Sequence, residues 1–159
     1  MKGIKTIEYN QADIKGRKIA IVATRWNSFI VDNLLAGALA HLTANGIEEN
    51  NISIVYCPGA FEIPLVCKKI ARRAEVDAII TLGAVIRGGT PHFEYVAGEC
   101  TRGLTQVGLE FELPIAFGVL TVDNEQQARE RSGHGEGSEN KGEESAAVVL
   151  EMISLLSRI

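Results

Sequence analysis

The sequence predicts an α/β protein: a three-layer α/β/α sandwich around a central, mainly parallel four-stranded sheet. Short apolar runs alternate with segments of helical periodicity, which is the pattern of β-α units that feed a parallel sheet. The predicted strands are apolar on both faces, so helices should cover both sides of the sheet. The length of 159 residues suits one domain over residues 1–159.

Four β-α units can be placed along the chain, in the order typical of flavodoxin-like proteins. The predicted strands cover residues 18–23, 52–57, 76–82 and 115–121. Apolar stripes predict helices over residues 30–42, 96–111 and 146–156. A further helix is predicted to end near residue 73, and a short charged helix is predicted over 125–131. Residues 1–16 are polar and aperiodic, which predicts an N-terminal arm or an added strand.

Composition excludes several classes of function. The net charge of −4 and the scattered Lys and Arg residues disfavour nucleic-acid binding. No apolar stretch is long enough to span a membrane, and the N-terminus lacks the apolar core of a signal peptide, so we expect a soluble cytoplasmic protein without a membrane partner. Cys57, Cys67 and Cys100 lack metal or redox spacing and are predicted to be buried free thiols. The three histidines are far apart, which predicts no metal site.

The most informative segment follows the third predicted strand. There a glycine-rich turn, Gly88-Gly89-Thr90, precedes a lone His92 and a helical pattern. Open α/β sheets bind ligands beyond the carboxyl ends of their strands, where backbone N–H groups and a helix N-terminus can hold an anion. Spacing alone leaves both a phosphate site and an ordinary glycine turn open. Dinucleotide and P-loop motifs are absent from the segment, which disfavours both classes.

Three segments carry a resemblance to a known family. PGAFEIP at residues 58–64, GAVIRGGTPHFEYV at 83–96 and FGVLT at 117–121 resemble the signature segments of the 6,7-dimethyl-8-ribityllumazine synthases, in the family's order and spacing. The similarity extends from about residue 17 to the C-terminus. It implies condensation of 5-amino-6-(D-ribitylamino)uracil with 3,4-dihydroxy-2-butanone 4-phosphate, with release of phosphate and water, as the penultimate step of riboflavin biosynthesis. It implies no cofactor.

The resemblance also assigns the catalytic and phosphate-binding residues. His92 matches the catalytic histidine, and histidine can exchange a proton near neutral pH. Gly89 and Thr90 match the residues that hold the substrate phosphate at a helix N-terminus. Arg131 matches a cation that reaches the phosphate from a neighbouring subunit. Without the resemblance, His92 would be interpreted as a helix-capping residue and Arg131 as a solvated helix residue.

Further residues are assigned to the pyrimidine and its ribityl chain. Trp26 matches an aromatic position that stacks on the pyrimidine, where phenylalanine or tyrosine is common in the family. The segment that lines the ribityl chain is matched by Ala60, Phe61 and Glu62. Backbone contacts to the uracil edge are matched by Ala84, Val85 and Ile86. Phe117 matches a ring wall from the adjacent subunit. Taken alone, Glu62 would be a first-turn helix carboxylate and the apolar residues would belong to the core.

The resemblance implies a homo-oligomer, with a pentamer as the minimum because the site draws residues from two chains. The loop from residue 132 to 142 is longer than the compact form usual in icosahedral members, by about two residues. This departure leaves open whether twelve pentamers close into a shell of about 60 subunits. It also leaves open the role of Lys141.

Two alternatives remain at this point. A flavodoxin-like binding or receiver domain shares the alternating pattern, but residues 24–28 supply no phosphorylatable aspartate. A paralogue that binds flavins or lumazines with little turnover is the second alternative. The presence of His92, Thr90 and Arg131 argues against it.

Overall fold

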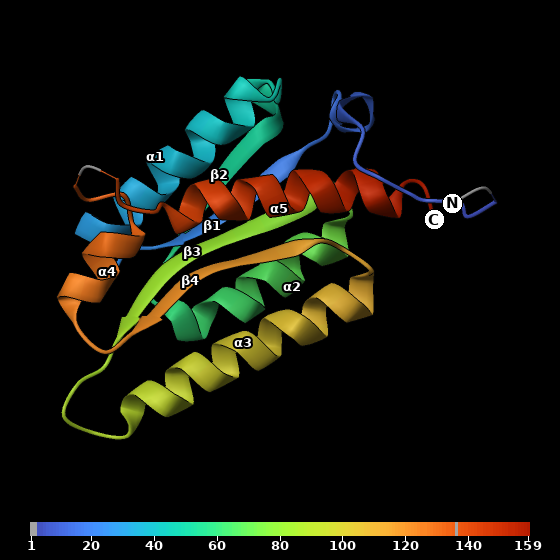
Figure 1. The fold of residues 1–159 in the computed structure, drawn as a ribbon. Helices are drawn as coiled ribbons and strands as arrows, with labels where there is room; N and C mark the ends of the chain where they lie inside the picture. Colours follow the sequence, from blue (N-terminus) through green and yellow to red (C-terminus); the bar gives the residue numbers. More distant parts are fainter. Residues whose placement is uncertain (1–2, 136) are drawn as a thin grey trace.

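The structure, a computed structural model that describes residues 3–135 and 137–159, contains the four-stranded sheet that the sequence predicts (Figure 1). The strands are β1 (Ile19–Thr24), β2 (Ile52–Cys57), β3 (Ala78–Ile86) and β4 (Ile115–Val122). All three pairings are parallel, and the strand order is β2-β1-β3-β4. The first strand of the sequence therefore lies inside the sheet, while β2 and β4 form its edges.

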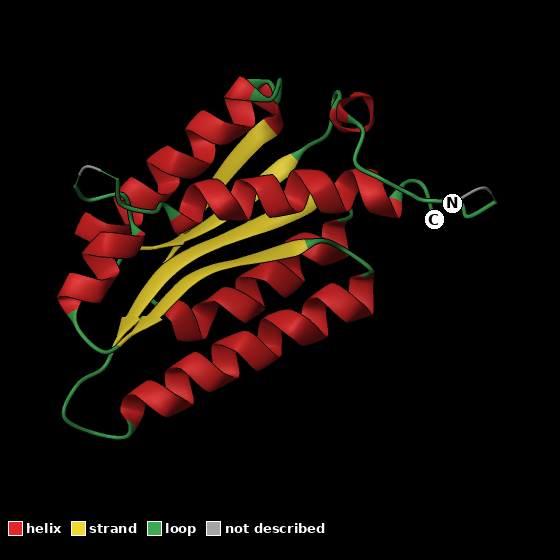
Figure 2. Cartoon of the chain, viewed as in Figure 1, coloured by secondary structure: helices red, strands yellow, loops and turns green. Residues whose placement is uncertain are grey.

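Helices cover both faces of the sheet, which confirms the three-layer prediction (Figures 1 and 2). They are α1 (Ser28–Ala44), α2 (Ile63–Arg73), α3 (His92–Phe111), α4 (Glu125–Arg131) and α5 (Lys141–Leu156). α1 and α5 lie on one face, and α2 and α3 on the other. Each face has its own apolar cluster. Asparagine side chains cap the last two helices, because Asn124 and Asn140 accept hydrogen bonds from backbone N–H groups in the first turns.

Three details differ from the sequence prediction. β3 continues to Ile86 instead of ending at residue 82, because residues 83–86 remain paired with β4. At the sheet edge, Ile54 and Tyr56 of β2 are exposed, so the helices do not cover that strand on both faces. Leu156, predicted to face inward from the last helix, is 40% exposed because it lies in the final turn.

The described part of the N-terminal arm forms a short 3₁₀ helix, Gln11–Ile14, and pairs with no strand in this chain. Ile14 is buried in the core beneath α5. The Asp13 carboxylate accepts hydrogen bonds from Ser154 Oγ at 2.7 Å and from Arg158 Nε at 2.6 Å. These contacts, led by the one from Arg158, lower the pKa of Asp13. The arm is thus fixed to the C-terminal helix.

The three cysteines are free and buried, as predicted. All of them lie in the cluster beneath α2 and α3. Burial raises the pKa of Cys100 to about 12, and the pKa values of Cys57 and Cys67 are raised for the same reason. Protonated, enclosed thiols act as small apolar side chains. No helix in the described residues is both long and apolar enough to cross a membrane.

The long loop between α4 and α5 is closed at its base. Ser132 forms an isolated antiparallel bridge with Asn140, and Gly133 N–H donates to the carbonyl of Glu139 at 2.8 Å. The Asn140 amide also donates to the carbonyl of Asn33 on α1 at 3.0 Å. These contacts hold the C-terminal end of α4 beside the N-terminal end of α5.

We predict that Gly142→Ala strongly destabilises the fold. A Cβ at Gly142 would overlap the backbone of Leu34, since the first turn of α5 packs directly on α1. Overpacking of this kind costs about 1–3 kcal/mol or more. Gly98→Ala is the matched control, because its Cβ would meet nothing and alanine favours a helix interior by about 0.5–1 kcal/mol. Thermal unfolding of both variants provides the test, and equal melting temperatures would contradict the prediction.

Candidate functional site

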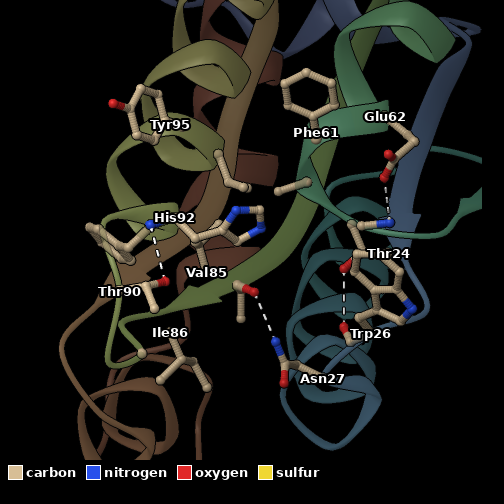
Figure 3. A pocket seen from close by; sticks show the side chains of 16 residues that line it. Thr24, Trp26, Asn27, Phe61, Glu62, Val85, Ile86, Thr90, His92 and Tyr95 are labelled. Atoms are coloured by element: carbon tan, nitrogen blue, oxygen red, sulfur yellow. Dashed lines mark hydrogen bonds between the residues drawn. The ribbon is translucent and has the colours of Figure 1, made fainter.

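A cavity of about 530 Å³ opens beyond the carboxyl ends of β1, β2 and β3 (Figure 3). This volume is within the usual range for small-molecule sites. The sequence-predicted residues that line the cavity are Trp26, Ala60, Phe61, Glu62, Ala84, Val85, Ile86, Thr90 and His92. Three separate segments of the chain contribute them: the turn after β1, the turn after β2, and the stretch from the end of β3 to the start of α3. The structure thus brings together most of the predicted site.

Trp26 forms one wall of the cavity. Two backbone bonds extend the pairing of β1 with β2 into this turn, from Arg25 N–H to the carbonyl of Cys57 at 2.9 Å and from Trp26 N–H to that of Pro58 at 3.1 Å. The indole rests on Gly59, where any Cβ would overlap the ring. Trp26 is nevertheless 65% exposed. A large, fixed aromatic surface therefore remains available to a flat ligand.

Asn27 connects the Trp26 turn to β3, and the sequence analysis missed it. Its backbone is left-handed, with a φ of 58°, and its amide donates to the carbonyl of Ala84 at 2.9 Å (Figure 3). Asparagine is one of the few residues that tolerate this conformation. An asparagine between a strand and a helix was the available signal. Thr24, Phe93, Tyr95 and Val96 also line the cavity and were not predicted to do so.

The turn after β2 contributes apolar side chains and one carboxylate to the lining of the cavity. Glu62 Oε2 accepts a hydrogen bond from Gly59 N–H at 3.0 Å, which fixes the turn that supports Trp26. The other carboxylate oxygen of Glu62 has no partner among the residues described. Phe61 is 59% exposed and stands at the cavity opening, as Figure 3 shows. Glu62 thus closes the turn with one oxygen and leaves a second acceptor beside the cavity.

His92 forms the wall opposite Trp26, and its imidazole points into the cavity (Figure 3). It is the first residue of α3, and its N–H donates to Thr90 Oγ at 3.5 Å. We refer to residues 88–92 as the His92 turn. The end of β3, with Ala84, Val85 and Ile86, forms the floor between the two walls. A proton donor or acceptor therefore faces an aromatic platform across a largely apolar space.

Three predicted residues lie outside the cavity lining. Gly89 is within the His92 turn, between the lining residues Gly88 and Thr90. Phe117 and Arg131 lie elsewhere, in a second depression of about 310 Å³ that we call the β4-edge hollow. It is lined by residues of β4 from 116 to 122, by Arg131, and by α5 residues including Lys141 and Glu144. One chain therefore holds the predicted site in two separate parts.

The β4-edge hollow contains two cations with different surroundings. Lys141 Nζ lies 2.9 Å from carboxylate oxygens of both Glu139 and Glu144. The hydrogen bonds that Lys141 donates to these groups, led by the one to Glu144, raise the pKa of Lys141. Arg131 Nη1 donates to the carbonyl of Gln127 at 3.1 Å and lies 3.9 Å from a carboxylate oxygen of Glu130. Arg131 is therefore held in place through one nitrogen, while Lys141 is already engaged by two carboxylates.

Comparison with known proteins resolves the class of this site. The sequence model of 6,7-dimethyl-8-ribityllumazine synthase matches residues 16–157, which is nearly the whole chain. The chain belongs to the 6,7-dimethyl-8-ribityllumazine synthase family. This confirms the resemblance carried by the three signature segments.

The 6,7-dimethyl-8-ribityllumazine synthases are transferases of riboflavin biosynthesis that act on small-molecule substrates as homo-oligomers. They condense 5-amino-6-(D-ribitylamino)uracil with 3,4-dihydroxy-2-butanone 4-phosphate. The cavity between Trp26 and His92 suits this reaction, because it combines a flat aromatic wall, a proton-transfer group and a turn rich in glycine at a helix N-terminus. The structure of this lumazine synthase family member thus combines an exposed aromatic face and a helix N-terminus in one cavity.

We predict that Asn27→Ala is more destabilising than Asn27→Gly. Both substitutions remove the hydrogen bond to the Ala84 carbonyl, which is worth about 0.5–1.5 kcal/mol. Only alanine also carries the cost of a left-handed backbone, about 1–2 kcal/mol, since glycine adopts it freely. Denaturant unfolding measures both variants against the parent protein. Glycine and alanine variants of equal stability would argue against backbone strain at this turn.

Proposed function

We propose that His92 is the general acid and base of the condensation, in a site that two neighbouring chains complete. The observation that carries this proposal is the convergence of three separate segments on one cavity, with the His92 imidazole pointing into it (Figure 3). The residues that meet there are those matched to the family's site. Residues matched to the phosphate cation and to the remaining ring wall lie in the β4-edge hollow instead.

The pyrimidine is proposed to bind between the aromatic wall and the end of β3. Trp26 offers an exposed indole face on which a planar ring can stack. Beside it, the backbone of Ala84, Val85 and Ile86 offers hydrogen-bonding groups to the uracil edge. The carboxylate oxygen of Glu62 that does not accept from Gly59 can accept a hydrogen bond from a ribityl hydroxyl. This arrangement leaves the reactive amino group of the pyrimidine between Trp26 and His92.

The reaction requires several proton transfers around carbonyl and amine groups. An imine forms with loss of water, phosphate leaves, and the product forms after tautomerisation, ring closure and a second loss of water. His92 is the one proton-transfer group that points into the cavity at its centre, among the residues drawn in Figure 3. A positioned acid or base contributes roughly 10²–10⁴-fold to the rate. Close positioning of the two substrates adds to this factor.

The phosphate is proposed to bind at the start of α3, with Gly89 and Thr90 as donors. A helix N-terminus attracts an anion, although the dipole contributes only about 0.3–1 kcal/mol at an exposed site. A full positive charge is therefore needed for firm binding. Within one chain the matched cation, Arg131, lines a different depression from Thr90 and His92. We infer that the Arg131 of a neighbouring chain supplies this charge.

Two dissimilar apolar faces support a ring-shaped assembly. Around the cavity, Trp26, Phe61 and Tyr95 are exposed. Along the β4 edge, Phe117, Leu109 and Val148 are exposed. Contact between two different faces is head-to-tail, and it closes into a ring when the rotation per chain allows it. We propose a ring of five chains, which is the number that the family resemblance supplies, as the smallest active assembly.

A binding protein with little turnover is the second candidate function. The same cavity could hold a flavin or lumazine ring against Trp26 without catalysing its formation. The residues matched to proton transfer and phosphate capture, His92, Thr90 and Arg131, have no purpose in such a protein. Their presence favours the enzyme, and the formation of fluorescent lumazine from the two substrates separates the candidates.

We predict that His92→Ala lowers turnover by roughly 10²–10⁴-fold with little change in pyrimidine affinity. Arg131→Ala should raise the KM for the butanone phosphate by roughly 10–100-fold, as expected for one charge-assisted hydrogen bond, with a smaller effect on the pyrimidine. The increase in lumazine fluorescence, measured against the spontaneous reaction, provides the rates. His41→Ala and Arg102→Ala, at residues of α1 and α3 that line neither depression, are matched controls. Loss of pyrimidine binding in the His92 variant would show a structural role instead.

A mixing experiment tests the shared site. Chains carrying His92→Ala keep an intact β4-edge hollow, and chains carrying Arg131→Ala keep an intact cavity. If they co-assemble at random in equal amounts, roughly a quarter of the sites pair an intact cavity with an intact Arg131. We expect activity to return accordingly in the co-assembled protein, and not when the preformed oligomers are combined without exchange. Continued inactivity of verified mixed oligomers would place both residues in a site within one chain.

A further inference from the structure

The His92 turn has few contacts that fix its conformation. Its residues from Gly88 to Pro91 are exposed. The hydrogen bonds within it are a long one from His92 N–H to Thr90 Oγ, at 3.5 Å, and one from Glu94 N–H to the carbonyl of Pro91, at 3.2 Å. Exposed segments with few buried contacts open readily. Yet Thr90 and His92 both line the cavity, so another interaction must hold the turn in place.

Arg87 supplies contacts at both sides of this turn. Its backbone N–H donates to the carbonyl of Val122 at 2.9 Å, where β3 and β4 end. The side chain forms an ion pair with Glu94 through Nη1 and donates from Nε to Asp123 Oδ1 at 3.0 Å. The guanidinium carbon also lies 4.2 Å from the centre of the Phe93 ring. One side chain thus binds the two residues that follow His92 to the end of β4.

We propose that Arg87 is a positioning residue that holds the His92 turn so that His92 and Thr90 face the cavity. Arg87 does not line the cavity itself. It acts through Phe93, a cavity wall residue, and through Glu94, both in the first turn of α3. This inference rests on the proposed role of His92. A reacting group displaced by about 1 Å can lose roughly 10²-fold in rate, so loss of the Arg87 contacts should be visible in catalysis.

Arginine is suited to this task in a way that lysine is not. Its planar fork can bind two carboxylates in different directions while its face rests on an aromatic ring. The hydrogen bond with Arg87 lowers the pKa of Glu94, and the bonds with Glu94 and Asp123 raise the pKa of Arg87. Arg87 and Glu94 are therefore both charged at neutral pH. Exposed ion pairs contribute little to overall stability, so the contacts can be removed without unfolding the protein.

An alternative role for Arg87 is direct binding of the substrate phosphate. The two roles predict opposite effects when a carboxylate partner is neutralised. If Arg87 positions the turn, Glu94→Gln removes part of the anchor and lowers catalysis. If Arg87 binds phosphate, Glu94→Gln frees the guanidinium from a competing anion and strengthens capture of the phosphorylated substrate. The sign of the Glu94→Gln effect therefore distinguishes the two roles.

The experiment compares Arg87→Met, Arg87→Lys and Glu94→Gln in the assembled protein, by kcat and by KM for each substrate. We expect Arg87→Met to lower kcat/KM by roughly 10–100-fold, with Arg87→Lys and Glu94→Gln intermediate. Lys68→Met is the matched control: it removes a cation paired at 2.9 Å with Glu110, near the other end of α3, and should keep full activity. Melting temperatures establish that all variants remain folded.

A second background shows whether Arg87 acts through His92. In a His92→Asn protein, Arg87→Met should lower kcat by less than about threefold, because the proton-transfer group that it positions is already absent. A change in the KM for the butanone phosphate remains in this background, because Thr90 is still present. The His92→Asn protein alone tests the role of His92, whereas the comparison between the two backgrounds tests Arg87. Three results would overturn the proposal: full activity of folded Arg87→Met, a lower KM for the butanone phosphate in Glu94→Gln, or the same loss of kcat from Arg87→Met in both backgrounds.

Discussion

The site depends on the register between β1 and β3. The pairing of these parallel strands runs from Ile19 opposite Ala78 to Ala23 opposite Leu82. β3 then continues to Ile86, supported by β4 alone on its other side. On the side of β1, the last residues of β3 are left without a strand partner. This part of β3 forms the cavity floor. Its buried backbone groups on the side of β1 need hydrogen-bond partners other than a neighbouring strand. Asn27 supplies one of them to Ala84, and the proposed uracil edge supplies others.

The same register explains which features could be predicted from sequence. Strand and helix periodicity located every element of the sheet, because apolar runs of strand length leave few alternatives. The end of β3 was predicted too early, since Gly83 signalled a turn and nothing in the local sequence shows that β4 would keep pairing to Val122. Asn27 was overlooked for a similar reason. Its amide acts on a carbonyl distant in sequence, and only the fold brings the two together.

The sequence predicted which residues form the candidate site, but not the contacts that hold them in place. The family resemblance placed Trp26, Glu62 and His92 in one site, and these residues do line one cavity. Only the structure shows the hydrogen bonds and ion pairs that fix these side chains. Glu62 also closes the turn under Trp26, and Arg87, treated in the sequence as part of a glycine-rich segment, connects the end of β4 to α3. Such contacts depend on side-chain directions that periodicity does not encode.

The glycines of the His92 turn are not explained by contacts within the single chain. Neither Gly88 nor Gly89 has a positive φ, and a Cβ at either position would meet nothing within 4 Å. Within one chain, therefore, neither backbone conformation nor crowding calls for glycine there, although glycine costs conformational entropy. A glycine at these positions is then best explained by a ligand or a second chain that approaches the backbone closely. A phosphate held by backbone N–H groups has this requirement, as does a neighbouring chain that brings Arg131 to the turn. Both belong to the site that we propose two neighbouring chains complete.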